Sequence, residues 1–581
     1  MKGAAVISSL GLLLLNWSAV QATPVGSNIA IECSGKFSPI SAADYVAAIN
    51  PGWNLGNTLD AVPDEGSWNN PPVVAATFDD VKAAGFKSVR IPVTYADHYT
   101  GGSPDWTIDP AWLQRVSDVV DMALDRDLYV VTNYRSINAF LDSWEWADVT
   151  ASGANLTAIE EKIYRTWVQI GEKLGCTSSL VAFEPINEPP ANTAEDGEEL
   201  NRINDLFLKA LVASGGFNTQ RVVTLVGGSM DSIKTSQWFK APTGFTNPWA
   251  IQYHYYSPYD FVFQAWGKTT WGSDADKESM EADFANIRGN FSDIPLVIGE
   301  FETNMLLEPA ARRKYNDFAV RTARKYGTSV MVWDNGDGAL DRATHTWRDP
   351  YLVDIILNAV EGISNSLADS TTDASATEQL SSAYIFHKVG DDVTDQPATF
   401  ILNGNKVNSI ETSNGTALSS SEDYSVSDGI VTFKKAFLSK YLSPTADPGS
   451  KANLTVTFSA GAGASIEVVQ WDVPTLGATS SQAVSGSDLL IPITWKGLYS
   501  LAAVKMLRED GVYLVDDWTQ YLGPLQQGRG TYSSHWDRDG AHVVLKEAAI
   551  SQVISSQVPT TFTFEFYPRV AGNAVNYTLT V

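Results

Sequence analysis

The feature that most constrains the fold is an alternation of short apolar segments with amphipathic helical patterns along residues 52–359. Eight strand–helix units in succession predict an α/β fold, the (β/α)8 TIM barrel, whose parallel strands form a closed core. The predicted strands are 52–56, 88–93, 129–133, 180–188, 221–226, 250–256, 295–301 and 329–333. The predicted helices include 77–84, 111–128, 156–174, 200–213, 277–289, 310–325 and 351–359.

Two of these strands end on a glutamate, at the face of a barrel that carries the active site. The strand through Phe183 delivers Glu188, and Pro189-Pro190 stop it and make its end rigid. The segment 295–301 delivers Glu300. Retaining glycoside hydrolysis requires such a pair, a protonated acid and an ionised nucleophile about 5–5.5 Å apart. A lone Asn-Glu-Pro tripeptide more often marks a helix cap or a salt bridge, but here it is one of several matching strand ends.

Charge and composition limit the partners. The chain has 581 residues, a net charge of −27 and a pI near 4.5. This balance argues against nucleic acid and anionic membranes as partners and fits a neutral substrate. The aromatic content of 11%, with 18 Trp, suits binding of sugar rings but also suits a core. No Cys/His pattern has metal-ligand spacing, so we expect no metal and no cofactor. We also expect the protein to be a monomer.

The amino terminus predicts export. Residues 1–22 have a basic start, an apolar core at 4–15 and a small-residue end, which is typical of a secretory signal peptide. The core is too short to span a membrane. We therefore expect a secreted, extracellular glycoprotein. Its candidate glycosylation sites are Asn155, Asn290, Asn414, Asn453 and Asn576. The two cysteines, Cys33 and Cys176, either form one disulfide or remain free.

Beyond the predicted barrel the composition and the hydrophobic pattern of the sequence change. The predicted catalytic domain covers 23–361, and a Ser/Thr/Ala/Asp-rich linker covers 362–380. Alternating β-type runs separated by Asn/Gly/Ser turns predict a small β-sandwich over 381–473. A third, β-rich and aromatic domain covers 474–581.

Several motifs in order carry a resemblance to a known family. They are GWNLGNTLD at 52–60, SVRIP at 88–92, NEP at 187–189, HYY at 254–256, GEF at 299–301 and WDNG at 333–336. Together they resemble glycoside hydrolase family 5, the large cellulase family, and within it the endoglucanases, xyloglucanases and lichenases. The region 381–473 resembles the immunoglobulin-like module that follows such catalytic domains. The region 474–581 resembles carbohydrate-binding module family 46.

The resemblance assigns roles residue by residue. It implies that Glu188 is the acid/base and Glu300 the nucleophile, held ionised by Arg90. It implies that Asn187 binds the sugar 2-hydroxyl. An acid that stays protonated near neutral pH needs a raised pKa, which we therefore expect for Glu188. The remaining implied or candidate substrate-binding residues are His254 and Tyr256 beside the carboxylates, Trp333 under the sugar, and Asn57 and His98 in the subsites.

One position departs from the family. The third strand ends in Asn133-Tyr-Arg135, whereas the family usually has Asn-x-His, so Arg135 stands where a substrate-binding His is expected. Arg is longer and permanently charged and has no acceptor. Glu302 is also unusual, because Gly often follows Gly-Glu-Phe in the family. We interpret Arg135 and Glu302 as a compensatory pair, and the direction of Glu302 stays open.

The leading prediction is a secreted, retaining endo-β-1,4-glucanase that acts on cellulose, xyloglucan or mixed-linkage glucan of plant or other cell walls. Because of Arg135, two alternatives remain: the same mechanism on mannan or a β-1,6-linked polymer, and a carbohydrate-binding protein without turnover. Candidate platforms in outer sugar subsites are Trp53, Trp144, Trp146, Trp266 and Trp271. In the third domain we expect Trp536 to be exposed for binding, and Trp495 and Trp518 to lie in the core.

Overall fold

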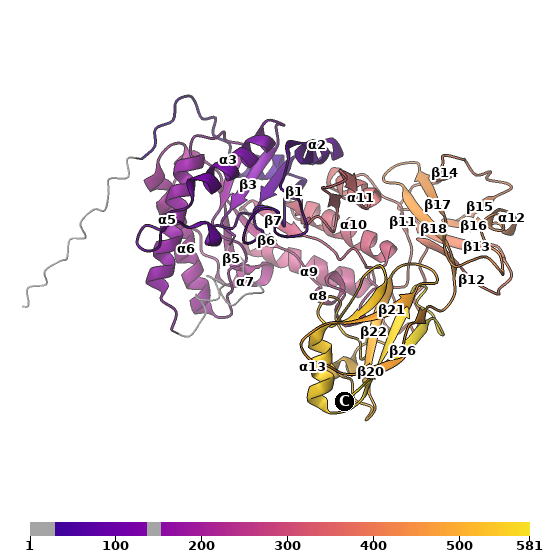
Figure 1. Ribbon diagram of the computed structural model, residues 1–581. Helices are drawn as coiled ribbons and strands as arrows, with labels where there is room; N and C mark the ends of the chain where they lie inside the picture. The colour runs from indigo at the N-terminus through magenta and orange to yellow at the C-terminus, as the bar shows by residue number, and fades with distance from the viewer. Residues whose placement is uncertain (1–29, 136–152) are drawn as a thin grey trace, which may run out of the picture.

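The first 361 residues of the chain contain a closed barrel of eight parallel strands, as the alternation predicts (Figure 1). The computed structural model describes residues 30–135 and 153–581. The barrel strands are β1 Gly52–Asn54, β2 Ser88–Ile91, β3 Tyr129–Asn133, β4 Val181–Glu184, β5 Val223–Asp231, β6 Trp249–His254, β7 Leu296–Phe301 and β8 Thr328–Val332. Their apolar side chains, such as Val89, Val130 and Ile251, are buried on both faces of the sheet, as parallel strands require.

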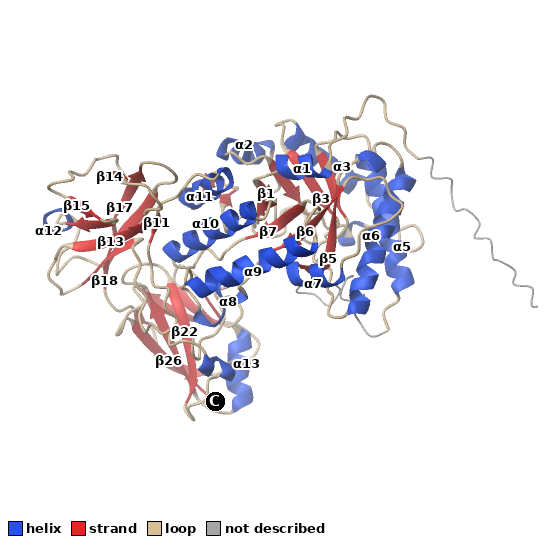
Figure 2. Ribbon diagram, turned by 180° about the vertical axis from the view of Figure 1, so that it is seen from behind, coloured by secondary structure: helices blue, strands red, loops and turns tan. Residues whose placement is uncertain are grey.

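Helices surround this barrel (Figure 2). They are α1 Ala42–Ala48, α2 Ala75–Ala84, α3 Pro110–Leu124, α5 Leu156–Leu174, α6 Ala194–Ser214, α7 Ser232–Trp238, α8 Tyr259–Val262, α9 Asp274–Asn290, α10 Pro309–Lys325 and α11 Pro350–Glu361. Capping residues fix several of their starts. Thr193 and Ser273 each form a capping box with the aspartate three residues later. Among the described residues, no helix has the length and apolar character to cross a bilayer.

Strand register brings the functional strand ends side by side. Asn54 on β1 pairs with Arg90 on β2, and Asn133 on β3 pairs with Glu184 on β4. On the far side of the barrel, His254 on β6 pairs with Glu300 on β7, next to a register shift. Polar groups that are distant in sequence therefore meet at one end of the barrel.

A disulfide joins Cys33 and Cys176, which settles the choice that the sequence left open. It ties the segment before α1 to the loop after α5, and Ile31 pairs with Gly215 beside it. The predicted signal peptide at 1–22 lies outside the described residues.

The tail forms two β-sandwiches, each with its own core. In the second module, the sheet β11-β13-β16-β15 faces the sheet β12-β18-β17-β14. In the third, β19-β21-β24-β23 faces β20-β26-β25-β22. The strands are β11 Leu367–Ala368, β12 Tyr384–Lys388, β13 Gln396–Ile401, β14 Val407–Thr412, β15 Tyr424–Ser427, β16 Ile430–Phe433, β17 Gly449–Phe458, β18 Ala464–Trp471, β19 Thr475–Leu476, β20 Ser480–Gln482, β21 Leu489–Thr494, β22 Leu501–Arg508, β23 Trp536–Arg538, β24 His542–Leu545, β25 Thr560–Phe566 and β26 Ala574–Thr580, with helix α13 at Glu547–Ser556.

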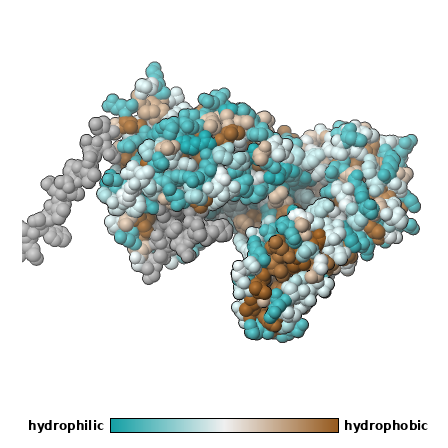
Figure 3. Space-filling view, viewed as in Figure 1, coloured by the Kyte–Doolittle hydropathy of each residue, from teal (hydrophilic) through white to brown (hydrophobic). Residues whose placement is uncertain are grey.

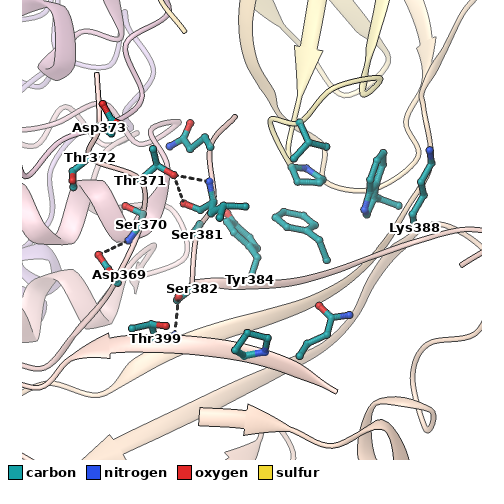
Figure 4. A pocket seen from close by; sticks show the side chains of 18 of the residues that line it. Asp369, Ser370, Thr371, Thr372, Asp373, Ser381, Ser382, Tyr384, Lys388 and Thr399 are labelled. Carbon is teal, nitrogen blue, oxygen red and sulfur yellow. Dashed lines mark hydrogen bonds between the residues drawn. The ribbon is translucent and has the colours of Figure 1, made fainter. Parts of the chain in front are cut away.

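The segment 362–380, which has a linker composition, is an ordered part of the second module. Its residues Leu367 and Ala368 form β11, and both side chains are buried. Hydrogen bonds link Thr371 to Leu380 and Ser382 to Thr399 along the wall of a groove of about 760 Å³ between the modules (Figure 4). Short polar residues serve here as hydrogen-bonding partners.

The third module packs against the barrel. Gln264, beyond α8, donates to the backbone of Ala502 at 2.8 Å, and Trp266 donates to Asp516 at 2.6 Å. Arg569 reaches back to the carbonyl of Gly267 at 3.0 Å. Figure 3 shows apolar residues gathered on one face of this module, whereas the visible face of the barrel is mostly hydrophilic. The loop after α8 is therefore held by contacts to both domains.

Candidate active site

Arg90 on β2 is the centre of a buried polar cluster at the carboxyl end of the strands. Its Nε and one Nη donate to the two carboxylate oxygens of Glu184, each at 2.7 Å. Its other N–H groups donate to Asn54 at 3.0 Å, to Asn187 at 2.7 Å and to Glu300. A guanidinium has five N–H donors, so each one has an acceptor. Burial opposes the charge of Arg90, but the carboxylates of Glu184 and Glu300 outweigh it and raise the pKa of Arg90.

Glu184 anchors this cluster and was not singled out as a site residue from the sequence. Its carboxylate is fully buried and also accepts hydrogen bonds from Asn133 at 2.9 Å and from Gln252 at 2.5 Å. It fixes Arg90 bidentately, so that the outer edge of the guanidinium faces Glu300 and Asn187. Arg90 therefore makes both the buried ion pair with Glu184 and the contact with Glu300.

Glu188 and Glu300 face each other across the end of the barrel. An oxygen of each lies within 4.8 Å of the other. Oxygens no more than 4.8 Å apart are compatible with carboxyl groups about 5–5.5 Å apart, the separation of retaining enzymes. The Tyr256 hydroxyl donates to Glu300 at 3.0 Å. His254 Nδ1 lies 2.7 Å from Glu188 and 3.6 Å from Glu300.

The two carboxylates differ in exposure and backbone. The Glu300 side chain is 3% exposed and that of Glu188 is 34% exposed. Glu188 is therefore the carboxyl group that is more accessible to a bound substrate. Glu188 also has a left-handed backbone, with φ of 42°, directly before Pro189. Such a conformation in a non-glycine residue costs roughly 1–3 kcal/mol and persists where surrounding contacts impose it.

The pKa of Glu188 differs from the expected direction. Burial raises it, but the hydrogen bond and charge of His254 and the charges of Arg135 and Arg90 together bring it below the ordinary glutamate value. We expected a raised value because an acid that stays protonated near neutral pH needs one, and the structure gives the opposite direction. The surroundings of Glu188 therefore favour its carboxylate form over its protonated form.

We expect His254→Leu to move the alkaline limb of the pH profile of kcat/KM to higher pH. If Glu188 is the acid of the site, this limb reports loss of its proton in wild type. Removal of the His254 hydrogen bond takes away a contact that favours the carboxylate, while burial of Glu188 remains, so its pKa rises. The measurement is kcat/KM against pH on a soluble glucan. An unmoved limb in an active variant would contradict the assignment of Glu188 as the acid.

Arg135 lies in the centre of the site. Its guanidinium is 4.7 Å from the centroid of the Trp333 ring, and its Nη1 lies 3.4 Å from Asp60 and 3.7 Å from Glu300. Among the described residues Arg135 forms ion pairs with Asp60 and Glu300 and none with Glu302, so a compensatory relation of Arg135 and Glu302 stays a hypothesis without a direct contact. One face of Trp333 is thus shared with a cation. Asp60, in the 52–60 motif, is a further site residue that was not singled out.

Two predicted subsite residues lie outside this network. The amide of Asn57 donates to Asn69 at 2.9 Å in the loop after β1. The His98 ring is buried and stacks on Trp112 of α3, with ring centroids 3.7 Å apart. No contact among the described residues joins either side chain to Glu188 or Glu300. A subsite role for them stays a prediction.

The candidate tryptophans divide by burial. Trp53 and Trp271 are buried in the barrel and cannot be sugar platforms. Trp536 is fully buried in the third module. The expected exposure is therefore wrong for all three residues. Alternation along β23 turns Trp536 into the core. Trp518 is 41% exposed, contrary to the core position expected for it. Trp495 is partly buried, and Trp144 and Trp146 lie outside the described residues.

A row of aromatic rings leads from the catalytic centre to the third module. Tyr256 contacts Phe263 with centroids 5.6 Å apart, and Phe263 contacts Tyr259 at 5.0 Å. Tyr259 contacts Trp266 at 5.8 Å, and Trp266 contacts Trp518 at 4.9 Å. Tyr259, Phe263 and Trp518 are exposed. Exposed aromatic faces in a row can stack on successive sugar rings.

Glu188, His254 and Glu300 are the one group of side chains in the described part of the chain whose atoms are close enough to share an ion. Both Glu300 oxygens accept hydrogen bonds, from Arg90 and Tyr256, and one Glu188 oxygen lies in hydrogen-bonding distance of His254 Nδ1.

Comparison with known proteins agrees with this geometry. Residues 52–339 match the model of the cellulases of glycosyl hydrolase family 5, and 379–468 match carbohydrate binding domain X2. Endoglucanase B of Paenibacillus lautus is 29% identical and covers all of this chain and 97% of its own. Endoglucanase B of Clostridium cellulovorans is 32% identical over 54% of this chain and 74% of its own. A crystal structure of a tri-modular family 5, subfamily 4 endo-β-1,4-glucanase from Bacillus licheniformis superposes with a TM-score of 0.80, at 34% identity, over 93% of this chain and all of that one.

The barrel and its matches define a glycoside hydrolase. The chain belongs to glycoside hydrolase family 5, the cellulase family, and has a carbohydrate-binding domain C-terminal to its barrel.

Proposed function

We propose that the chain is an endo-β-1,4-glucanase that cleaves a neutral β-glucan by double displacement, with Glu300 as nucleophile and Glu188 as acid/base. The observation that carries the residue roles is the pair of carboxylates within 4.8 Å, one in the loop after β4 and one near the end of β7. The activity is supported by the relatives named endoglucanase and by the B. licheniformis enzyme solved with cellotetraose, which superposes with a TM-score of 0.81 at 34% identity.

The contacts of Glu300, Glu188, Asn187 and Tyr256 suggest a role for each residue in the proposed reaction. Glu300 attacks the anomeric carbon while Glu188 protonates the departing oxygen, and Glu188 then takes a proton from the water that releases the sugar. The Asn187 oxygen accepts from Arg90, which leaves its N–H2 group for the sugar 2-hydroxyl. The Tyr256 hydroxyl holds one oxygen of Glu300, which orients the other toward Arg90.

The test is hydrolysis of carboxymethylcellulose, xyloglucan, barley β-glucan and glucomannan by the purified protein, with Glu300→Ala as the control. Cleavage of a β-1,4-glucan that disappears in the variant supports the proposal and identifies the substrate. Cleavage of glucomannan alone would favour a mannan-directed enzyme. Binding to these glycans without any cleavage would leave a carbohydrate-binding protein.

We expect Arg135→His to change the rate or the substrate preference. The change removes the guanidinium above Trp333 and one cation beside Glu300. It frees a face of the Trp333 ring for a sugar and adds an acceptor, for an effect of about 10-fold or more on kcat/KM. The same glycan panel measures it, with Arg115→His at the barrel surface as a matched control. Unchanged rates and preference would leave Arg135 without a specialised role.

The aromatic row from Tyr256 to Trp518 supports a longer binding path, in which the third module holds part of the glucan. We also propose that the protein is secreted and glycosylated. The N-terminal apolar segment supports export, and all five candidate asparagines are exposed on the structure. An endoglycosidase-sensitive mass on the protein from culture medium tests both points.

A further inference from the structure

Glu302 lies in a side pocket next to the catalytic centre. It follows β7 two residues after Glu300, and the sequence left its direction open. The structure places it in the wall of a pocket of about 390 Å³ that also includes Tyr256 and Trp333. Tyr532 and Ser533 of the third module form part of the same wall. A volume of this order is sufficient for a sugar-sized ligand.

The Glu302 carboxyl group has no polar partner from the protein. Across residues 30–135 and 153–581, no hydrogen bond reaches it and no cationic group lies within ion-pair distance. It packs instead against Gly338, where an added Cβ would lie 2.2 Å from Oε1. Because no described protein group binds this half-buried carboxyl group, its hydrogen-bonding capacity is available to a ligand in the pocket.

The surroundings favour the neutral acid. Burial is the largest influence, and the negative charges of Asp334, Glu300 and Asp337 act in the same direction, whereas Arg312 from α10 opposes them. Together they raise the pKa of Glu302 to about 8. A protonated carboxyl group offers one O–H donor and further acceptors, the set that a sugar hydroxyl requires.

We propose that Glu302 is a substrate-contacting, specificity-determining residue, whose carboxyl group exchanges hydrogen bonds with hydroxyl groups of a neutral sugar unit held in the pocket beside Trp333. The inference rests on the proposed glucanase function. The sugar unit is either a glucosyl unit of the backbone near the cleaved bond or a branch that the backbone carries. Both present the same hydroxyl chemistry, and substrates with and without branches distinguish them.

The test compares kcat and KM of wild type, Glu302→Ala and Glu302→Gln on barley β-glucan, which is unbranched, and on xyloglucan. We expect Glu302→Ala to raise KM by about 10-fold with little change in kcat, because a hydrogen-bonding group that contacts substrate is lost. Glu302→Gln keeps a donor and an acceptor at the same place and is expected to stay within about 3-fold of wild type. A raised KM on both glucans identifies a backbone unit, and a raised KM on xyloglucan alone identifies a branch.

Melting temperatures separate binding from folding. If Glu302→Ala unfolds at a lower temperature than wild type, Glu302→Met takes the place of the alanine variant in the comparison. Methionine preserves the side-chain volume but lacks the carboxyl group's hydrogen bonds. An active wild type with unchanged KM in a folded Ala or Met variant overturns the inference, and so does a Gln variant as impaired as the Ala variant. A wild type that cleaves none of the β-1,4-glucans of the panel overturns the proposed function, and this inference with it. A wild type that cleaves carboxymethylcellulose but neither barley β-glucan nor xyloglucan supports the function and overturns this inference.

Discussion

Replacing Glu300 by alanine is expected to lower kcat on soluble β-glucan by about 10⁴-fold or more, while the protein still folds. The variant loses the group that forms the covalent intermediate, and the acid Glu188 cannot replace it. Reducing-sugar release measures the loss, and the melting temperature checks the fold. Activity within 10-fold of wild type would remove Glu300 from the nucleophile role.

Glu188→Ala is the matched comparison, because the two variants fail at different steps. With an aryl β-cellobioside whose leaving group needs no proton, Glu188→Ala still forms the glycosyl-enzyme on Glu300. Azide then attacks this intermediate without a base and gives a β-glycosyl azide. In Glu300→Ala, azide occupies the space of the missing nucleophile and gives the α-glycosyl azide. The opposite pairing of variant and product would reverse the two roles.

The sequence predicted the elements best where local periodicity determines them. Strand β3 and helix α5 have the predicted bounds, because a continuous apolar run and a strong 3.6-residue pattern leave little choice. Strand ends then located Arg90, Glu188, His254 and Glu300, since parallel strands present their carboxyl ends on one face.

The rest depends on contacts that no local pattern reveals. Glu184 lies 94 positions from Arg90, and its role becomes visible only when β2 and β4 lie in the same barrel. The direction of the Glu188 pKa depends on His254 and Arg135, which come from two other strands. Trp536 follows a polar loop, which suggested exposure, but the strand that it begins buries it.

Arg90→Met is expected to lower the free energy of unfolding of the barrel by about 3–5 kcal/mol and to abolish activity. The fully buried guanidinium is the only cation within hydrogen-bonding distance of Glu184 in the described structure, and its loss leaves that carboxylate without a counter-charge. The amide oxygens of Asn54 and Asn187 lose a donor as well. Thermal unfolding of the purified protein measures the change as a lowered melting temperature.

Two variants isolate the cause. Arg126 makes a bidentate ion pair with the exposed Asp79 on the barrel surface. Arg126→Met therefore removes an arginine–carboxylate pair that is in contact with water, and it is expected to lower the free energy of unfolding by at most about 1 kcal/mol. Arg90→Lys keeps the buried charge but supplies three donors for five acceptors, and is expected to recover part of the stability without the activity. If Arg90→Met and Arg126→Met melted alike, the buried cluster would not be the anchor of this site. If Arg90→Lys were fully active, charge alone, and not the five-bond geometry, would orient Glu300 and Asn187.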